Sequence, residues 1–255
     1  METLKVALVQ MDIIWEDITQ NLNQLDEMLW DADADIIVLP EMFTTGFSNA
    51  SENLAVKMDG EPVQWMHDLA CRLGSLLMGS MIIEEEGRYY NRLICAFPDG
   101  ELKTYDKKHL FSLVRENEHY TAGEERLIFD FKGWKIFPLI CYDLRFPVWN
   151  RNVEMAELMI YVANWPEKRQ HHWNLLLNAR AVENQCYVAG VNRIGQDGND
   201  IPHNGMSTVY DFWGNEVFSA KDLQGVFTVE LSKAKIEEHR ERFGFWRDRD
   251  NFEIK

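Results

Sequence analysis

The 255-residue sequence has few basic residues and no long hydrophobic run. Its 26 Lys and Arg stand against 42 Asp and Glu, a net charge of −16. An acidic chain of this kind is repelled by the phosphates of nucleic acids. No apolar stretch reaches the roughly 18–20 residues that span a bilayer. We therefore expect neither nucleic acid nor a membrane as a partner.

Cysteine is also scarce and scattered. Cys71, Cys95, Cys141 and Cys186 lie far apart and form no Cys-x-x-Cys pair, so a disulfide framework is not expected. The first residues enter a strand-like run directly and do not resemble a secretory leader. These absences predict a reduced, cytoplasmic protein.

Apolar and aromatic residues, in contrast, are abundant. Hydrophobic residues make up 46% of the chain, with nine Trp and fourteen Phe, which excludes a disordered acidic chain. No low-complexity linker interrupts the sequence, so we expect one domain over residues 1–255. Its tail, about 234–255, mixes aromatic and charged residues, and we expect it to pack on the body or on a partner subunit.

Short apolar runs alternate with amphipathic helical patterns along the chain. The runs predict strands over 4–11, 35–40, 76–84, 89–97, 101–105, 127–131, 134–141, 159–163, 186–193, 207–211, 216–219 and 226–231. The helical patterns predict helices over 18–30, 62–73, 147 to about 157, and 171–184. Strand–helix–strand units mixed with hairpins indicate an α/β fold of two sheets, each covered by helices on its outer face.

Cys141 is the most distinctive candidate for chemistry. It ends an apolar strand and lies at the turn that leads into a helix, which Pro147 is expected to open. Helix N-termini lower the pKa of a cysteine, and their N–H groups can hold an oxyanion. The alternative interpretation is a small buried apolar residue, which is the usual role of a free cysteine. Cys71, Cys95 and Cys186 are expected to have that structural role.

Two further segments carry groups that a nucleophilic cysteine needs. Glu41 follows a buried strand, and a carboxylate shielded from water is a better proton acceptor; its alternative role is a solvated loop acid. Lys107 and Lys108 lie between a strand and an aromatic run. Adjacent side chains of an extended segment point to opposite faces, so only one of the two lysines can face a site.

Together these segments resemble the carbon–nitrogen hydrolase (nitrilase) superfamily, whose catalytic Glu, Lys and Cys follow in this order. The resemblance rests on Pro40-Glu41, Lys107–Phe111, Ile140–Pro147, Asn164–Pro166, His172-Trp173 and Ala179–Gln185. It implies a four-layer α-β-β-α sandwich that forms a homodimer or a higher homo-oligomer and needs neither cofactor nor metal. The register of the family's Lys-x-His-Leu-Phe motif implies that Lys107 is the catalytic lysine.

The family also has a second glutamate before a Pro-Gly turn, which orients the lysine and the substrate amide. Here the turn is Ala122-Gly123, so the alignment leaves Glu116 and Glu118 open, with Glu116 favoured by spacing. Val148 stands where many members have glutamate, a difference that bears on the branch of the family and not on the chemistry.

The residue types then suggest a mechanism. Glu41 takes the thiol proton of Cys141, and the thiolate attacks an amide carbonyl. Lys107 and the backbone N–H of Tyr142 hold the oxyanion, an effect of about 3 kcal/mol per donor. Glu41 returns the proton to the departing ammonia and activates the water that hydrolyses the thioester.

Among the branches of the family, the ω-amidase branch is the one that this sequence resembles most, on the basis of Pro40–Ser48, Val148 and Asn164–Pro166. That resemblance implies hydrolysis of the terminal amide of 2-oxo-acid amides, such as 2-oxoglutaramate and 2-oxosuccinamate, and a link to methionine salvage. Candidate substrate-binding residues are Phe43, Asn164, Trp165 and Arg145, with Arg193 as a second candidate for the substrate carboxylate. Core packing is the alternative role of Phe43 and Trp165.

Several other functions remain open at this point. Another amidase or N-carbamoyl amidohydrolase of the same superfamily would share the chemistry, and a catalytically silent member would be a binding protein. A cysteine–histidine protease could use His109, His171, His172 or His203. A zinc site is less favoured, because His171 and His172 are adjacent and no ligand pair has the usual spacing.

Overall fold

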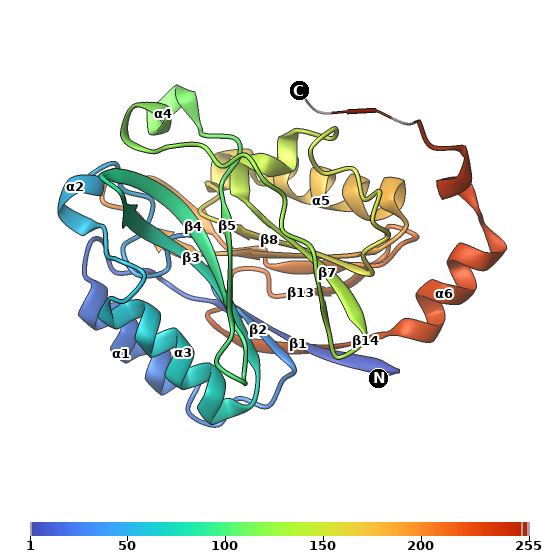
Figure 1. The fold of residues 1–255 in the computed structure, drawn as a ribbon, viewed down its shortest axis with the longest axis horizontal. Coiled ribbons are helices and arrows are strands. Elements are labelled where there is room, and N and C mark those ends of the chain that lie inside the picture. The colour runs from blue at the N-terminus through green and yellow to red at the C-terminus, as the bar shows by residue number, and fades with distance from the viewer. Residues whose placement is uncertain (1, 251, 254–255) are drawn as a thin grey trace.

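The computed structural model describes residues 2–250 and 252–253, and two six-stranded sheets dominate it (Figure 1). The first sheet contains β1 (Thr3–Gln10), β2 (Ile36–Val38), β3 (Leu76–Glu85), β4 (Arg88–Ala96), β5 (Leu102–Asp106) and β14 (Gly225–Ser232), in the order β14-β1-β2-β3-β4-β5. The second contains β6 (Phe129–Phe131), β7 (Trp134–Ile140), β8 (Leu158–Ala163), β9 (Tyr187–Asn192), β12 (Thr208–Tyr210) and β13 (Glu216–Ser219), in the order β13-β12-β9-β8-β7-β6. A separate hairpin pairs β10 (Ile194–Gln196) with β11 (Pro202–Asn204).

Helices cover the outer faces of the sheets. The α-helices are α1 (Ile18–Met28), α2 (Ser51–Leu54), α3 (Glu61–Leu73), α4 (Glu116–His119), α5 (Gln170–Asn184) and α6 (Lys233–Arg242). Short 3₁₀-helices are η1 (Ser112–Val114), η2 (Cys141–Arg145), η3 (Glu167–Arg169) and η4 (Phe245–Asp248). Figure 1 shows α1 and α3 on one side of the sheets and α5 on the other, so the predicted α-β-β-α sandwich is confirmed. None of the helices in the described residues is long and apolar enough to cross a membrane.

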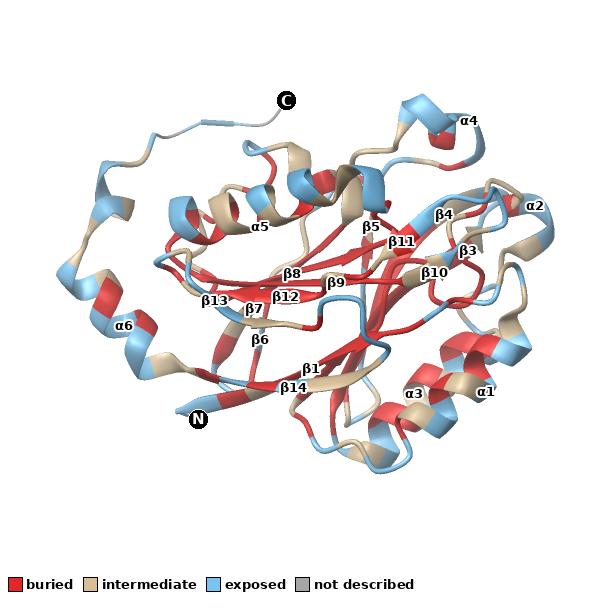
Figure 2. Cartoon of the chain, turned by 180° about the vertical axis from the view of Figure 1, so that it is seen from behind, coloured by how far each residue is buried: buried red, intermediate tan, exposed pale blue. Residues whose placement is uncertain are grey.

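Strand β1 shows how the sequence builds these layers. Leu4, Val6 and Leu8 point into the cluster between the two sheets, whereas Ala7 and Val9 point into the cluster beneath α1 and α3. Both faces are therefore apolar, as is typical of a strand covered on both sides. Figure 2 shows the resulting buried zone along the strands, with exposed residues on the outer faces of the helices.

On the second sheet, α5 approaches closely enough to require a glycine. A Cβ at Gly190 would lie 2.4 Å from Leu177 and 2.6 Å from Trp173. Both of these α5 side chains are fully buried, so Gly190 lets the helix pack directly on β9.

The prediction of a helix from Pro147 to about Glu157 is wrong. These residues form turns and coil, and Met155 has a positive φ of 61°. The side chain of Asn152 bonds both the N–H and the C=O of Ala156, each at 2.8 Å. Such side-chain bonds compete with helical hydrogen bonding, and here they close a loop instead.

The predicted tail contains α6 and η4. Arg240 donates hydrogen bonds to the carbonyls of Met155, Ala156 and Gln185, which attach α6 to the body. Phe243 contacts the ring of Trp213 at 4.9 Å, so this part of the tail packs on the body. Residues 251, 254 and 255 of the predicted tail lie outside the described residues.

Candidate active site

The candidate residues follow strand ends that meet at one edge of the sandwich. Glu41 follows β2, Lys107 follows β5, Cys141 follows β7 and Asn164 follows β8. β5 runs in the same direction as β3, because two antiparallel pairings separate them. In open α/β sheets, ligands bind beyond the carboxyl ends of strands, and the candidate site lies at that edge.

Glu41 is fully buried and held from several directions. Its Oε1 accepts hydrogen bonds from Lys107 Nζ at 2.9 Å and Asn91 Nδ2 at 2.8 Å. Its Oε2 accepts one from the backbone N–H of Asn164 at 2.8 Å, and Asn164 Nδ2 donates to the Glu41 carbonyl. The carboxylate therefore has one fixed orientation, and it is not a solvated loop acid.

Lys107 is only 1% exposed, and carboxylates surround its ammonium. Besides Glu41, Nζ donates to both carboxylate oxygens of Glu116, at 2.9 and 3.0 Å. Burial lowers the pKa of Lys107, but the charges of Glu116 and Glu41 outweigh that effect and raise the pKa above its usual value. The neighbouring Lys108 instead lies 5.2 Å from the ring of Trp149, so only one lysine of the pair faces the site.

The structure places Glu116, and not Glu118, beside the lysine. Glu116 is fully buried and its Oε2 accepts the N–H of Phe111 at 2.5 Å, whereas Glu118 pairs with Arg115 at the surface. Burial raises the pKa of Glu116, and the Lys107 charge opposes that rise. The turn that lacks proline keeps its glycine because a Cβ at Gly123 would lie 2.2 Å from a carbonyl oxygen of the preceding strand.

Cys141 occupies a strained turn between β7 and the short helix η2. Its φ is +42°, which is rare for a residue other than glycine. Asp143 secures the turn: its Oδ2 accepts the N–H of Ile140 at 3.1 Å and the hydroxyl of Tyr105 at 2.7 Å. Its Oδ1 accepts the N–H of His109 at 3.0 Å. Sequence reasoning missed this positioning role, although Asp143 lies two residues after the cysteine.

The expectation of a lowered pKa for Cys141 is wrong. Burial raises the pKa of the thiol well above its usual value, and the Glu41 charge adds to that rise while Lys107 opposes it. η2 is a 3₁₀-helix of five residues, too short for a large helix dipole. The thiol is therefore protonated at neutral pH and needs a base to become a nucleophile.

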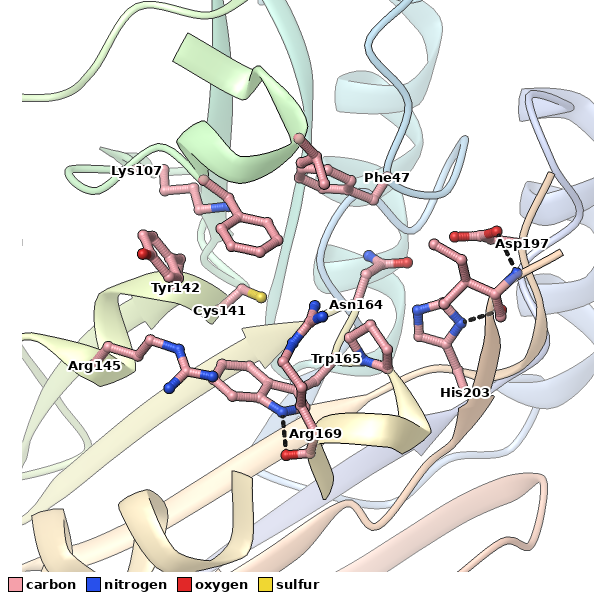
Figure 3. A pocket seen from close by; sticks show the side chains of 14 residues that line it. Phe47, Lys107, Cys141, Tyr142, Arg145, Asn164, Trp165, Arg169, Asp197 and His203 are labelled. Atoms are coloured by element: carbon pink, nitrogen blue, oxygen red, sulfur yellow. Dashed lines mark hydrogen bonds between the residues drawn. The ribbon is translucent and has the colours of Figure 1, made fainter. Parts of the chain in front are cut away.

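A cavity of about 70 Å³ opens in front of the cysteine. Figure 3 shows Cys141, Lys107 and Arg169 directed toward its centre. The predicted residues on its wall are Lys107, Cys141, Tyr142, Arg145, Asn164 and Trp165. Tyr142 lies in the first turn of η2, where N–H groups lack helical partners. A volume of this size has room for a small molecule.

Two of the residues predicted to bind the substrate do not line the cavity. Phe43 does not line the cavity; it is fully buried beneath α3, 6.0 Å from the ring of Trp65. Phe47, four residues later, lines the cavity instead. Arg193 is also fully buried and does not line the cavity. Its guanidinium bonds Asp12 and three backbone carbonyls, those of Ile13, Ile194 and Gln196.

Arg169, at the end of η3, lines the cavity and was missed. The only signal was the basic pair Lys168-Arg169 that follows Trp165-Pro166. Such a pair is usually a solvated surface feature, so nothing in the pattern singled out Arg169.

The histidines do not supply the base of a protease. His203 lines the cavity, but its Nδ1 lies 3.0 Å from the carbonyl of Ile201, and burial lowers its pKa to about 4. His109 stacks on Phe146 at 3.7 Å, and His171 and His172 are exposed on α5. Over residues 2–250 and 252–253, no group of three or more His, Cys, Asp or Glu side chains is arranged to hold a metal ion.

The fold and this site define a hydrolase that acts on carbon–nitrogen bonds. A family model described as carbon-nitrogen hydrolase matches residues 5–241. The chain belongs to that family.

Two of the proteins that this chain resembles are named as amidases. The chain is 43% identical to the omega-amidase YafV of Escherichia coli, over the full length of both. It is 33% identical to the 2-oxoglutaramate amidase of Bacillus subtilis, over 92% of this chain and 93% of that one.

Two solved structures of superfamily members superpose closely on this chain. The CN-hydrolase superfamily protein XC1258 of Xanthomonas campestris, described with an arsenic adduct in its active site, superposes with a TM-score of 0.98 at 43% identity over both full chains. Nit3 of Saccharomyces cerevisiae, a nitrilase superfamily member, superposes with a TM-score of 0.85 at 29% identity over 94% of each chain.

Proposed function

We propose that the protein is an ω-amidase that hydrolyses the terminal amide of 2-oxo-acid amides such as 2-oxoglutaramate and 2-oxosuccinamate. The observation that carries this substrate class is the full-length similarity to proteins named omega-amidase. The closed cluster of Glu41, Lys107 and Glu116 beside Cys141 supports the reaction type. The products are the 2-oxo acid and ammonia.

In this reaction Glu41 is the general base. The Cys141 thiol is protonated at neutral pH, so the proton passes to the Glu41 carboxylate as the sulfur attacks the amide carbon. Glu41 then gives that proton to the nitrogen as the C–N bond breaks and ammonia leaves. A thioester on Cys141 remains. The same carboxylate activates the water that hydrolyses it and releases the acid.

The negative charge that develops on the carbonyl oxygen needs donors fixed in advance. Lys107, whose ammonium is held by Glu41 and Glu116, supplies one donor. The backbone N–H of Tyr142 supplies the other. Glu116 keeps the ammonium in place as Glu41 gains and loses its proton, which assigns the second glutamate a positioning role.

We also propose that residues 1–255 form one catalytic unit that functions in the cytoplasm as a homodimer, with methionine salvage as its metabolic setting. Exposed Val148, Phe245 and Phe252 line one surface groove together with charged residues, and exposed apolar side chains rimmed by polar residues are typical of a subunit interface. The metabolic setting rests on the family resemblance alone.

Ammonia release tests the proposal. The substrates are 2-oxoglutaramate, 2-oxosuccinamate, glutamine, a simple aliphatic amide, a nitrile and an N-carbamoyl amino acid, each with wild type and Cys141→Ala. We expect the 2-oxo amides to be preferred about a hundredfold, which requires roughly 2.7 kcal/mol of dedicated contacts. Cys141→Ala should fold normally and lose turnover by roughly 10⁴-fold or more.

Other results would replace the proposal with a rival. Preference for the N-carbamoyl compound or the plain amide would keep the mechanism and reject the substrate class. Ammonia release by Cys141→Ala at the wild-type rate would reject the nucleophile.

A further inference from the structure

Two arginines, Arg145 and Arg169, line the same cavity as Cys141. Arg145 lies over the indole of Trp165, with its guanidinium carbon 4.8 Å from the ring centroid. Arg169 lies 5.3 Å from the ring of Phe111. Figure 3 shows the Arg169 guanidinium directed toward the sulfur of Cys141.

Neither guanidinium has a carboxylate partner among residues 2–250 and 252–253. Arg145 contacts only a ring nitrogen, His172 Nδ1, at 3.2 Å, and the Arg169 guanidinium makes no hydrogen bond within that part of the chain. Asp197 also lines the cavity, but its Oδ1 accepts the backbone N–H groups of Asn199 and Ile201. The cavity therefore contains two guanidinium groups that no carboxylate of the described residues contacts.

Two guanidinium groups in one cavity repel each other, which is unfavourable unless an anion binds between them. Burial is the main cause that lowers the pKa of Arg169; Cys141 opposes that shift, and the nearby charge of Arg145 adds a smaller lowering effect. In a protein with a net charge of −16, carboxylates were available to pair with both arginines. A carboxylate that binds between the two guanidinium groups would supply the missing charge with strong, charge-assisted hydrogen bonds.

The segment that carries Arg169 is fixed by hydrogen bonds and is not a loose surface loop. Trp165 Nε1 donates to the Arg169 carbonyl at 2.8 Å, and the Arg169 N–H donates to the Pro166 carbonyl at 2.9 Å. The Trp165 N–H in turn bonds Asn192 Oδ1 at 2.7 Å. These contacts hold the backbone of Arg169 at the cavity.

We propose that Arg169, assisted by Arg145, binds the carboxylate at the far end of the substrate and thereby selects monoamides of small dicarboxylic acids. The proposal rests on the proposed function, because the amide must lie at Cys141 for its far end to reach the arginines. A guanidinium presents a planar fork that matches a carboxylate. The carboxylate, more than the 2-oxo group, then determines affinity, so glutaramate is also a substrate.

Glutaramate and pentanamide test this assignment, because they share the amide and the three methylene groups and differ at the far end, where one has a carboxylate and the other a methyl group. Arg169→Gln should lower kcat/KM for glutaramate at least 30-fold, as expected for loss of a charge-assisted contact. It should change kcat/KM for pentanamide by less than about threefold. Arg169→Lys should restore part of the loss.

Lys168→Gln is the matched control, because Lys168 is an exposed neighbour in η3 that does not line the cavity. It should leave kcat/KM for both amides unchanged. Equal losses for glutaramate and pentanamide in Arg169→Gln would show a structural role and overturn the assignment. Unchanged values for both would also overturn it.

The same assay separates this inference from the proposed function. Wild type that hydrolyses neither 2-oxoglutaramate nor glutaramate would defeat the proposed function. Wild type that hydrolyses both, with Arg169→Gln equally active, would defeat only the role of Arg169.

Discussion

The cavity has a buried inner end at Lys107 and a more exposed mouth at Arg145 and Arg169. The cations at these two ends differ in whether carboxylates pair with them. At the inner end, Lys107 contacts two carboxylates and is almost fully buried. At the mouth, Arg145 and Arg169 lie against aromatic rings and have no carboxylate partner within the described residues. The pKa of Lys107 is raised, whereas that of Arg169 is lowered.

We interpret this difference as one of role: Lys107 is proposed to take part in the reaction, whereas Arg145 and Arg169 are proposed to bind the substrate. A buried ammonium that must keep its charge through each catalytic cycle needs permanent partners. A guanidinium that receives a substrate carboxylate must be free before binding. We therefore infer that charge compensation within the protein distinguishes the proposed catalytic end of the cavity from the proposed substrate-selecting end.

Removal of Lys107 should have the largest effect. Lys107→Met leaves Glu41 and Glu116 buried without their cation, so we expect loss of turnover and about 3–5 kcal/mol of unfolding free energy at pH 8. Urea denaturation measures the loss. Lys108→Met is the matched control and should cost less than about 1 kcal/mol, because Lys108 makes only a cation–π contact with Trp149.

The stability of Lys107→Met should also depend on pH in a defined direction. Without the ammonium, the folded-state pKa of Glu116 rises further above its unfolded value. A carboxyl of this kind stabilises the fold at low pH and loses that contribution as the pH rises through its folded-state pKa. The variant should therefore be closer to wild type at pH 5 than at pH 8, and the opposite trend would argue against compensation by Lys107.

Glu41→Gln should have an intermediate effect and act on the thiol. The Glu41 charge raises the pKa of Cys141, so its removal lowers that pKa and increases the thiolate fraction at pH 8. Iodoacetamide should then alkylate Cys141 at least about threefold faster, because each unit of pKa corresponds to tenfold in thiolate, while amide turnover is lost. Exposed Cys71 provides the internal control, and an equal or slower rate at Cys141 would contradict the effect of the Glu41 charge on the pKa of the thiol.

Arg169→Gln should have the smallest effect on stability. The guanidinium has no partner to lose within the described residues, so we expect a change below about 1 kcal/mol. Arg193→Gln is the contrasting case, because that guanidinium is buried and bonds Asp12 and three backbone carbonyls, and we expect a cost of about 2 kcal/mol or more. If both substitutions lower the free energy of unfolding equally, the Arg169 guanidinium has a stabilising partner within the folded protein and the comparison fails.

Much of the fold could be predicted because its strands are short apolar runs and its site residues follow directly after them. Glu41, Lys107 and Cys141 were located by that rule together with the family motifs. The segment after Cys141 could not be predicted, since Pro147 signals a helix start and the competing side-chain bonds of Asn152 become visible only in three dimensions.

The cavity wall was harder to predict, because it depends on which face of a loop turns inward. Phe43 and Phe47 are equivalent in sequence pattern, yet one enters the core and the other lines the cavity. Likewise, tertiary partners place Arg169 at the cavity and hold the buried Arg193 against Asp12. The register of a strand fixes the direction of a side chain, but no such periodicity constrains these loops.

The most direct test of the account is the identity of the residue that carries the acyl group. Wild-type enzyme is mixed with excess 2-oxoglutaramate, quenched in acid within one turnover, digested and analysed by mass spectrometry. We predict the acyl group on the peptide that contains Cys141, and no acylated peptide from Cys141→Ala. An acyl group on any other residue, or first-turnover ammonia from Cys141→Ala equal to that of wild type, would contradict the account.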